Sequence, residues 1–135
     1  MIKLSGRSMS LKKISLPHFK ISATTAYIPS ESDPAQRKYM FAYRIEIKNL
    51  GNQTAQLVSR HWIITDSYGN KEEVKGPGVV GLQPKITPDQ VFQYESACPL
   101  STSTGTMKGY YSFLSDNGEP FNVEIPEFYL IAPQA

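Results

Sequence analysis

The most regular feature of the chain is an alternation of apolar and polar side chains, with a period of two, between residues 39 and 48. One face of this stretch carries Tyr39, Phe41, Tyr43, Ile45 and Ile47, and the other carries Met40, Ala42, Arg44, Glu46 and Lys48. Such a period predicts a β-strand with one buried face and one face in water. The turn-forming sequence Asn-Leu-Gly-Asn at residues 49–52 ends it.

Weaker alternation predicts further short strands on both sides of this one. They cover residues 19–27, 57–65, 71–75, 90–96, 107–114, 121–125 and 127–131. A loop with two prolines is expected at residues 28–34, and a loop rich in Ser and Thr at residues 99–105. Asn117-Gly118 is a strong signal for a hairpin turn. No segment keeps a helical period over ten residues.

The stretch 57–65 differs from the other predicted strands because both of its faces are mixed. Val58, Arg60, Trp62 and Ile64 share one face, and Leu57, Ser59, His61 and Ile63 share the other. We therefore expect partial burial on each side. In a two-sheet sandwich, a Trp on a central strand typically points into the core.

Together these strands indicate an all-β fold. We predict a single-domain immunoglobulin-like or fibronectin type III-like β-sandwich of two antiparallel sheets with about seven to eight strands. A small barrel is the competing arrangement. Ten prolines and nine glycines in 135 residues fit many turns and short strands. The predicted domain covers residues 16–135, after a mobile N-terminal segment at residues 1–15.

Composition narrows the classes of function. The formal net charge is only +2, and no cluster of Lys or Arg forms a stripe, so neither nucleic acid nor a membrane surface is an expected partner. No apolar run reaches the roughly 20 residues that a membrane span needs. The single cysteine, Cys98, excludes a disulfide within the chain and favours a reducing compartment, so the expected location is cytoplasmic.

The most distinctive motif is Gly76-Pro77-Gly78-Val79-Val80-Gly81, which has the spacing G-x-G-x-x-G. In dinucleotide-binding proteins this spacing brings a pyrophosphate to the N-terminus of a helix. Here Pro84 and Pro88 argue against a following helix, and Pro77 removes a backbone donor, so we reject a Rossmann site. Two interpretations stay open: a backbone nest that binds an anion with help from Lys75 or Lys85, or glycines that allow positive φ and close packing.

The remaining reactive residues form no recognisable catalytic or metal-binding pattern. His18, His61 and Cys98 have no metal-ligand spacing, so no metal and no cofactor are predicted. Cys98 with His61 would be a nucleophile–base pair, but a buried, unreactive thiol is the favoured interpretation. His61 is expected at the rim of the core, bonded to a backbone carbonyl. Residues 101–104 lack a nucleophile elbow, so we predict that the chain is not an enzyme.

Five further motifs follow one another along the chain: SRHWIITD at 59–66, GPGVVGLQP at 76–84, CPLST at 98–102, GTMKG at 105–109 and EIPEF at 124–128. In this order they resemble the ApaG family. The resemblance covers about residues 16–131 and implies a fibronectin type III-like sandwich. It implies no established enzymatic activity. It also implies a link by gene neighbourhood to diadenosine tetraphosphate hydrolysis, and by name to cobalt and magnesium tolerance.

Related domains in eukaryotic F-box and polymerase-interacting proteins imply a protein-binding role, and the family's glycine loop has been connected with pyrophosphate. We therefore expect a non-enzymatic interaction module with an unidentified protein partner. The alternatives are binding of a pyrophosphate-containing nucleotide by the glycine loop, or a role in cobalt or magnesium homeostasis. The candidate ligand-binding residues are Arg60, His61, Lys75, Gly76, Gly78, Gly81, Cys98, Thr102 and Gly105. Edge strands of such a sandwich can also pair across a two-fold axis, which would give a homodimer.

Overall fold

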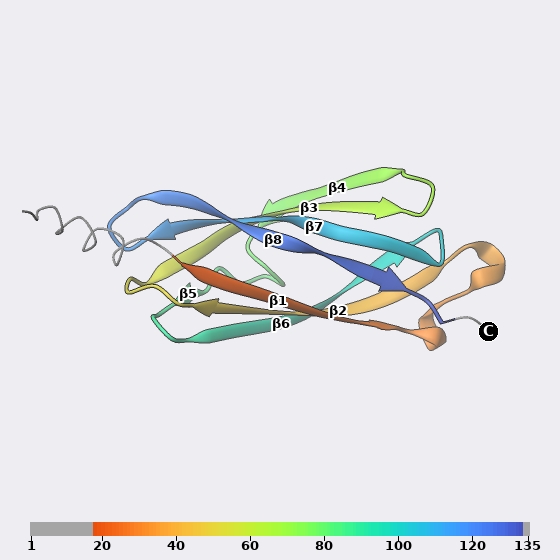
Figure 1. Ribbon diagram of the computed structural model, residues 1–135, viewed down its shortest axis with the longest axis horizontal. Helices are drawn as coiled ribbons and strands as arrows, with labels where there is room; N and C mark the ends of the chain where they lie inside the picture. Colours follow the sequence, from red (N-terminus) through yellow and green to blue (C-terminus); the bar gives the residue numbers. More distant parts are fainter. Residues whose placement is uncertain (1–17, 134–135) are drawn as a thin grey trace, which may run out of the picture.

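Two antiparallel sheets face each other in the computed structural model, which describes residues 18–133 (Figure 1). The first sheet has the order β1 (Phe19–Tyr27), β2 (Tyr39–Asn49), β6 (Val91–Leu100). The second has the order β4 (Lys71–Pro77), β3 (Ala55–Asp66), β7 (Thr104–Ser115), β8 (Pro120–Ile131), and the short β5 (Lys85–Ile86) also pairs with β3. The prediction of a fibronectin type III-like sandwich is confirmed, and the barrel alternative is wrong because the sheets stay separate.

The inner faces of the two sheets form one core. Its fully buried large side chains include Phe41, Ile45 and Ile47 from the first sheet and Leu57, Tyr111, Phe113 and Leu130 from the second. The face of β2 predicted as buried is therefore confirmed. Trp62 is 2% exposed and meets Tyr43, Tyr111 and Phe128 in edge-to-face contacts. The predicted inward orientation of the Trp is also confirmed.

A β-bulge explains the mixed faces of residues 57–65. The pairing of β3 with β7 shifts register between Leu57 and Ser59, so Val58 is an extra residue. An extra residue reverses which alternate positions face inward. Leu57 is therefore buried before the bulge, and Trp62 and Ile64 after it. The assignment of Leu57 and Trp62 to opposite faces was therefore wrong, although several side chains of this strand are half-buried as expected.

Several predicted boundaries need correction. The loop expected at 99–105 is mostly strand, since β6 continues to Leu100 and β7 begins at Thr104. The strands predicted at 121–125 and 127–131 form one strand, β8, with a register shift opposite Met107 to Gly109. The loop at 28–34 contains the 3₁₀ turns η2 (Pro29–Glu31) and η3 (Pro34–Gln36). The Asn-Gly hairpin is confirmed, with φ of 87° at Gly118. Residues 1–15, predicted as mobile, lie outside the described residues.

The two long sides of the sandwich differ. On one side β1 and β8 lie against each other, and the Thr25 hydroxyl donates to the Tyr129 carbonyl at 3.3 Å. On the other side the edge strands are β4 and β6, drawn at the top and bottom of Figure 1. Two adjacent cavities lie between them. Within residues 18–133, no helix has the length and apolar character needed to cross a bilayer.

Candidate functional site

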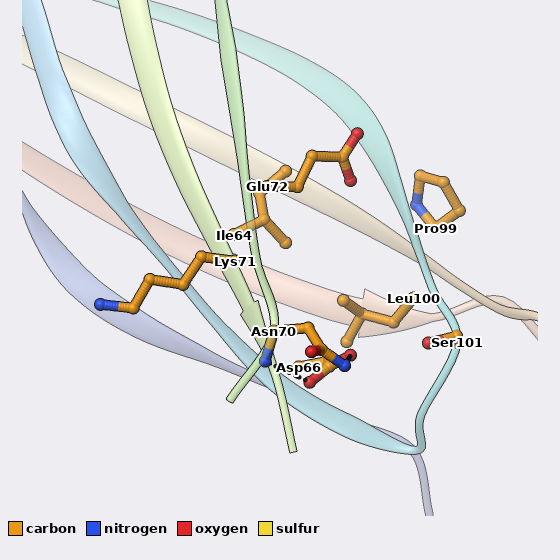
Figure 2. A pocket seen from close by; sticks show the side chains of 8 residues that line it. All are labelled: Ile64, Asp66, Asn70, Lys71, Glu72, Pro99, Leu100 and Ser101. Carbon is orange, nitrogen blue, oxygen red and sulfur yellow. Dashed lines mark hydrogen bonds between the residues drawn. The ribbon is translucent and has the colours of Figure 1, made fainter. Parts of the chain in front are cut away.

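The cavities between β4 and β6 form a groove along the open side of the sandwich. The larger has a volume of about 260 Å³, and its walls include Tyr43, Arg60, Trp62, Val74, Ser96 and Cys98. The smaller, about 130 Å³, lies further toward the Asp66–Asn70 turn. Ile64, Glu72 and Pro99 line both cavities. Figure 2 shows the smaller one, with Glu72 of β4 across from Pro99 of β6.

Arg60 is held in this groove by the glycine-rich segment. Strand pairing places Arg60 opposite Gly76. Its Nη1 donates to the carbonyls of Pro77 at 2.9 Å and Gly78 at 3.0 Å. A Cβ on Gly76 would lie 3.0–3.2 Å from the guanidinium atoms Nη1, Nη2 and Cζ. The segment thus offers carbonyl oxygens to an internal cation, and the missing side chain at Gly76 leaves room for that cation.

The rest of the glycine loop is a tight hairpin. Val79 and Leu82 exchange two backbone hydrogen bonds, each 2.8 Å long. The residues between them, Val80 and Gly81, have φ of 43° and 81°, as two-residue hairpin turns require. Gly78 has φ of 59° and donates its N–H to a carbonyl of β3 at 2.8 Å. A Cβ there would lie 2.2 Å from the Leu82 carbonyl oxygen.

The loop's backbone donors are therefore largely engaged. The amides of Gly78, Val79 and Leu82 bond to carbonyls of the protein, and Pro77 has no amide hydrogen. The segment leads into the short strand β5, where a dinucleotide site would have a helix. These contacts follow the interpretation in which the glycines serve positive φ and close packing.

Three tyrosines lie near Arg60: Tyr111 is its partner in the pairing of β3 with β7, Tyr43 lines the groove with it, and Tyr94 bonds to Tyr111. Tyr94 and Tyr111, both buried, share a hydrogen bond of 2.5 Å. Burial raises the pKa of Tyr94 and of Tyr111, and the Arg60 charge opposes this increase in both. Burial also raises the pKa of Tyr43, and a hydrogen bond with Ser96 opposes part of this increase. The three hydroxyls therefore stay neutral, and Tyr43 lines the groove together with Arg60.

Cys98 lines the groove as a buried thiol. Burial, and to a smaller extent the Glu72 carboxylate, raises its pKa to about 11. His61 does not share its surroundings: it lies on the outer face of the second sheet, where Nε2 is 2.7 Å from Glu73 Oε1 and Nδ1 is 3.0 Å from the Tyr110 hydroxyl. The prediction that His61 bonds to a backbone carbonyl was therefore wrong. The two residues form no nucleophile–base pair.

The other candidate residues lie apart from Arg60. Lys75 is exposed and pairs with His61 in the strand register, so it faces away from the groove. Thr102 is buried; its hydroxyl accepts from the Ser67 amide at 3.1 Å and donates to the Thr104 carbonyl at 2.8 Å. A Cβ on Gly105 would lie 2.6 Å from a backbone oxygen of β3. Thr102 and Gly105 thus support the connection of β6 to β7.

The structure therefore brings together Arg60, Gly76, Gly78 and Cys98 from the predicted set. Sequence reasoning missed further groove residues, among them Tyr43, Glu72, Val74 and Ser96. A signal for Glu72 and Val74 was present, because counting back from the Asp66–Asn70 turn pairs them with Ile64 and Trp62. Within the described part of the chain, no three His, Cys, Asp or Glu side chains gather as a metal site would require.

Comparisons with known proteins show which protein family the chain belongs to. The family model of the ApaG domain matches residues 29–115. Protein ApaG of Bdellovibrio bacteriovorus is 61% identical over 125 residues, which cover 93% of this chain and 98% of that protein. The chain belongs to the ApaG family. Protein ApaG of Bordetella pertussis is 47% identical over 97% of this chain and 98% of its own length.

Solved ApaG-like structures share the fold. A crystal structure from Bordetella pertussis, of a protein called ApaA, superposes with a TM-score of 0.84 at 48% identity. The match covers 88% of this chain and 97% of that one. The sandwich that carries the groove and the Arg60–Gly76 contact in this chain therefore has the same fold as that solved structure.

Proposed function

We propose that this ApaG-family chain is a non-enzymatic interaction module whose protein partner binds along the open side of the sandwich, over the groove between β4 and β6. The observation that carries the proposal is the groove itself. It combines a fixed cation, neutral hydroxyls and apolar walls on a rigid two-sheet scaffold. Binding sites usually combine apolar walls with a few well-placed polar groups.

The strands beside the groove favour a protein as the ligand. Both β4 and β6 are edge strands, and an edge strand presents backbone donors and acceptors that an extended partner segment can pair with. The chemistry favours binding over catalysis, because the Cys98 thiol is protonated at neutral pH and lies apart from His61. The buried thiol also suits a cytoplasmic location.

Site-specific photo-cross-linking in cells tests this proposal. A photoreactive amino acid at the exposed groove positions Glu72 or Ala97 is expected to cross-link to a defined protein partner. The matched controls are Lys20 and Glu46, exposed positions on the first sheet away from the groove. Cross-links of equal pattern and yield from all four positions, or none from the groove positions, would reject the proposal.

A nucleotide ligand is the competing function. Because the amides of Gly78, Val79 and Leu82 are already bonded, the support for it is confined to the lysines beside the loop. Calorimetric titration with a dinucleoside polyphosphate, with and without magnesium, compares the two functions directly. Saturable heat that disappears in the Lys75→Ala variant would replace the interaction module by a nucleotide-binding protein.

A further inference from the structure

We infer that Arg60 is the recognition residue of the groove, and that it binds the carboxylate of an acidic side chain in an extended segment of the partner protein. This inference rests on the proposed function, since it assigns the ligand chemistry of the same groove. The glycine-rich segment then has a different task from cradling phosphate. It fixes an arginine, and the arginine binds the anion.

Arg60 is a half-buried cation with no ion-pair partner among residues 18–133. Its two side-chain hydrogen bonds to described residues both run through Nη1 and both end on carbonyl oxygens. The ion pairs found among residues 18–133 are Arg44–Glu95 and His61–Glu73, and neither includes Arg60. The Nε–Nη2 edge of the guanidinium remains for a ligand, and this edge matches the two oxygens of a carboxylate.

The position of the guanidinium is fixed before any ligand arrives. The Pro77 and Gly78 carbonyls hold Nη1, and the guanidinium lies against Gly76. A fixed fork loses less conformational entropy on binding than a mobile side chain does. In the neighbouring walls, Tyr43 and Cys98 both keep their protons at pH 7. Reduced access to water strengthens a charge-assisted hydrogen bond in such surroundings.

The charges of the groove suit a segment that carries one carboxylate. Arg60 pairs with Gly76 and Glu72 pairs with Ile64, so cation and anion are four residues apart along β4. At about 3.3 Å per residue, the two backbone positions are roughly 13 Å apart along the strand. A singly charged carboxylate balances the single guanidinium, and the Glu72 end of the groove is left for a basic group of the same segment.

The same separation favours an extended segment as the carrier of that carboxylate. A strand lying along the groove would place about four of its residues between the Arg60 end and the Glu72 end. Edge strands on both walls can bond its backbone. The partner segment is then acidic at the Arg60 end, and a basic side chain near Glu72 would complete the match.

The single tryptophan provides the test, because Trp62 lies in the wall of the groove and gives the protein one indole N–H signal. That signal is followed by ¹H–¹⁵N NMR during titration with a blocked peptide, acetyl-Thr-Val-Glu-Val-Thr-amide. The control is the same peptide with Gln in place of Glu, which removes only the negative charge. We expect a saturable shift with the Glu peptide and an affinity about tenfold or more lower for the Gln peptide.

Two variants assign the effect to Arg60. Arg60→Met keeps the apolar stem and should abolish the preference for the Glu peptide. Arg44→Met removes an exposed arginine of the first sheet, where it pairs with Glu95 of the same sheet. This variant should keep the preference for the Glu peptide. Unchanged backbone amide signals show that each variant is folded. Acetate is added as a competitor, and it is expected to weaken binding of the Glu peptide more than sodium chloride of equal ionic strength does.

The outcomes separate the two proposals. Equal affinity for the Glu and Gln peptides, no shift with either, retained preference in Arg60→Met, or competition by acetate no greater than that of sodium chloride would each overturn the carboxylate assignment. Cross-links from Glu72 and Ala97 would in those cases still support the interaction module. Conversely, selective binding of the Glu peptide without any cellular cross-link would support the Arg60 assignment and reject the proposed function.

Discussion

The guanidinium of Arg60 lies against the α-carbon of Gly76, so closely that a Cβ on this glycine would be 3.0 Å from Nη1 and 3.1 Å from Nη2. Gly76 is not among the residues with positive φ, so its backbone conformation suits any residue. A glycine is therefore required at this position to make room for the Arg60 guanidinium, and not to allow an unusual backbone conformation. Each glycine of the motif has a separate physical reason, and none of these reasons involves phosphate.

Replacing Gly76 by Ala should displace Arg60 without unfolding the protein. The new methyl group would meet the far end of a flexible side chain, which can move aside. We expect a loss of stability of about 0.5–1.5 kcal/mol, the size of a lost hydrogen bond, together with loss of the Glu-peptide preference. Urea unfolding and the NMR titration measure the two effects. A Gly76→Ala variant that binds the Glu peptide as tightly as the parent would contradict the role given to Gly76.

Gly78 and Gly81 should respond differently to the same change. Both have positive φ, 59° and 81°, which costs an alanine about 1–2 kcal/mol. A Cβ on Gly81 has no neighbour within 4 Å, whereas one on Gly78 would lie 2.2 Å from the Leu82 carbonyl oxygen. Gly78→Ala must also move the hairpin backbone, so it should cost at least about 2 kcal/mol more than Gly81→Ala. Equal urea midpoints for the two variants would show that the hairpin packs less tightly than described.

The hydroxyl pair of Tyr94 and Tyr111 should behave as one unit. Removing one hydroxyl leaves the other buried without its partner, which costs about 1–3 kcal/mol. Removing both should cost less than the sum of the two single changes. Unfolding of Tyr94→Phe, Tyr111→Phe and the double variant gives the coupling energy. Tyr129→Phe, at a residue that is 64% exposed, is the control and should not change stability. Additive single effects would mean that the hydrogen bond contributes nothing.

The Cys98 thiol should be almost unreactive in the folded protein. Its pKa is about 11, above the ordinary value of 9.0, because burial and the Glu72 carboxylate disfavour the thiolate. At pH 8 the thiolate fraction is then about 100-fold below that of an unperturbed thiol. Alkylation by iodoacetamide should be slow, should rise with pH without a plateau up to pH 9, and should become faster in Glu72→Gln. Denatured protein gives the reference rate. A plateau below pH 9 in the folded protein would be inconsistent with this pKa.

Local pattern and long-range assembly differ in what the sequence reveals. The alternation in β2 identifies its buried face because the strand is regular, but the bulge at Val58 depends on pairing with β7 and leaves only a blurred pattern. The Arg60–Gly76 contact was within reach, since the turn at 66–70 fixes the register of β3 and β4. The groove was not, because β4 and β6 belong to different sheets and meet only when the sheets pack.

The turn that ends β3 should make stability depend on pH through Asp66. Its Oδ1 accepts the amides of Tyr68 and Asn70, both at 2.9 Å, and its Oδ2 accepts the Asn70 side-chain amide at 3.0 Å. The Asn70 side chain is the largest cause of a pKa lowered below 3.8. Since the folded state favours the carboxylate, the stabilisation is present above pH 4 and is lost as the pH falls through the folded pKa.

Asp66→Asn keeps an acceptor oxygen but removes the charge, so it isolates this contribution. The parent should melt at a higher temperature than the variant by a constant margin above about pH 5, and the margin should shrink below pH 4. The other carboxylates titrate alike in both proteins and cancel in the difference. Thermal unfolding followed by circular dichroism from pH 3 to pH 7 measures it. A margin that stays constant or widens below pH 4 would mean that the turn does not prefer the ionised form of Asp66.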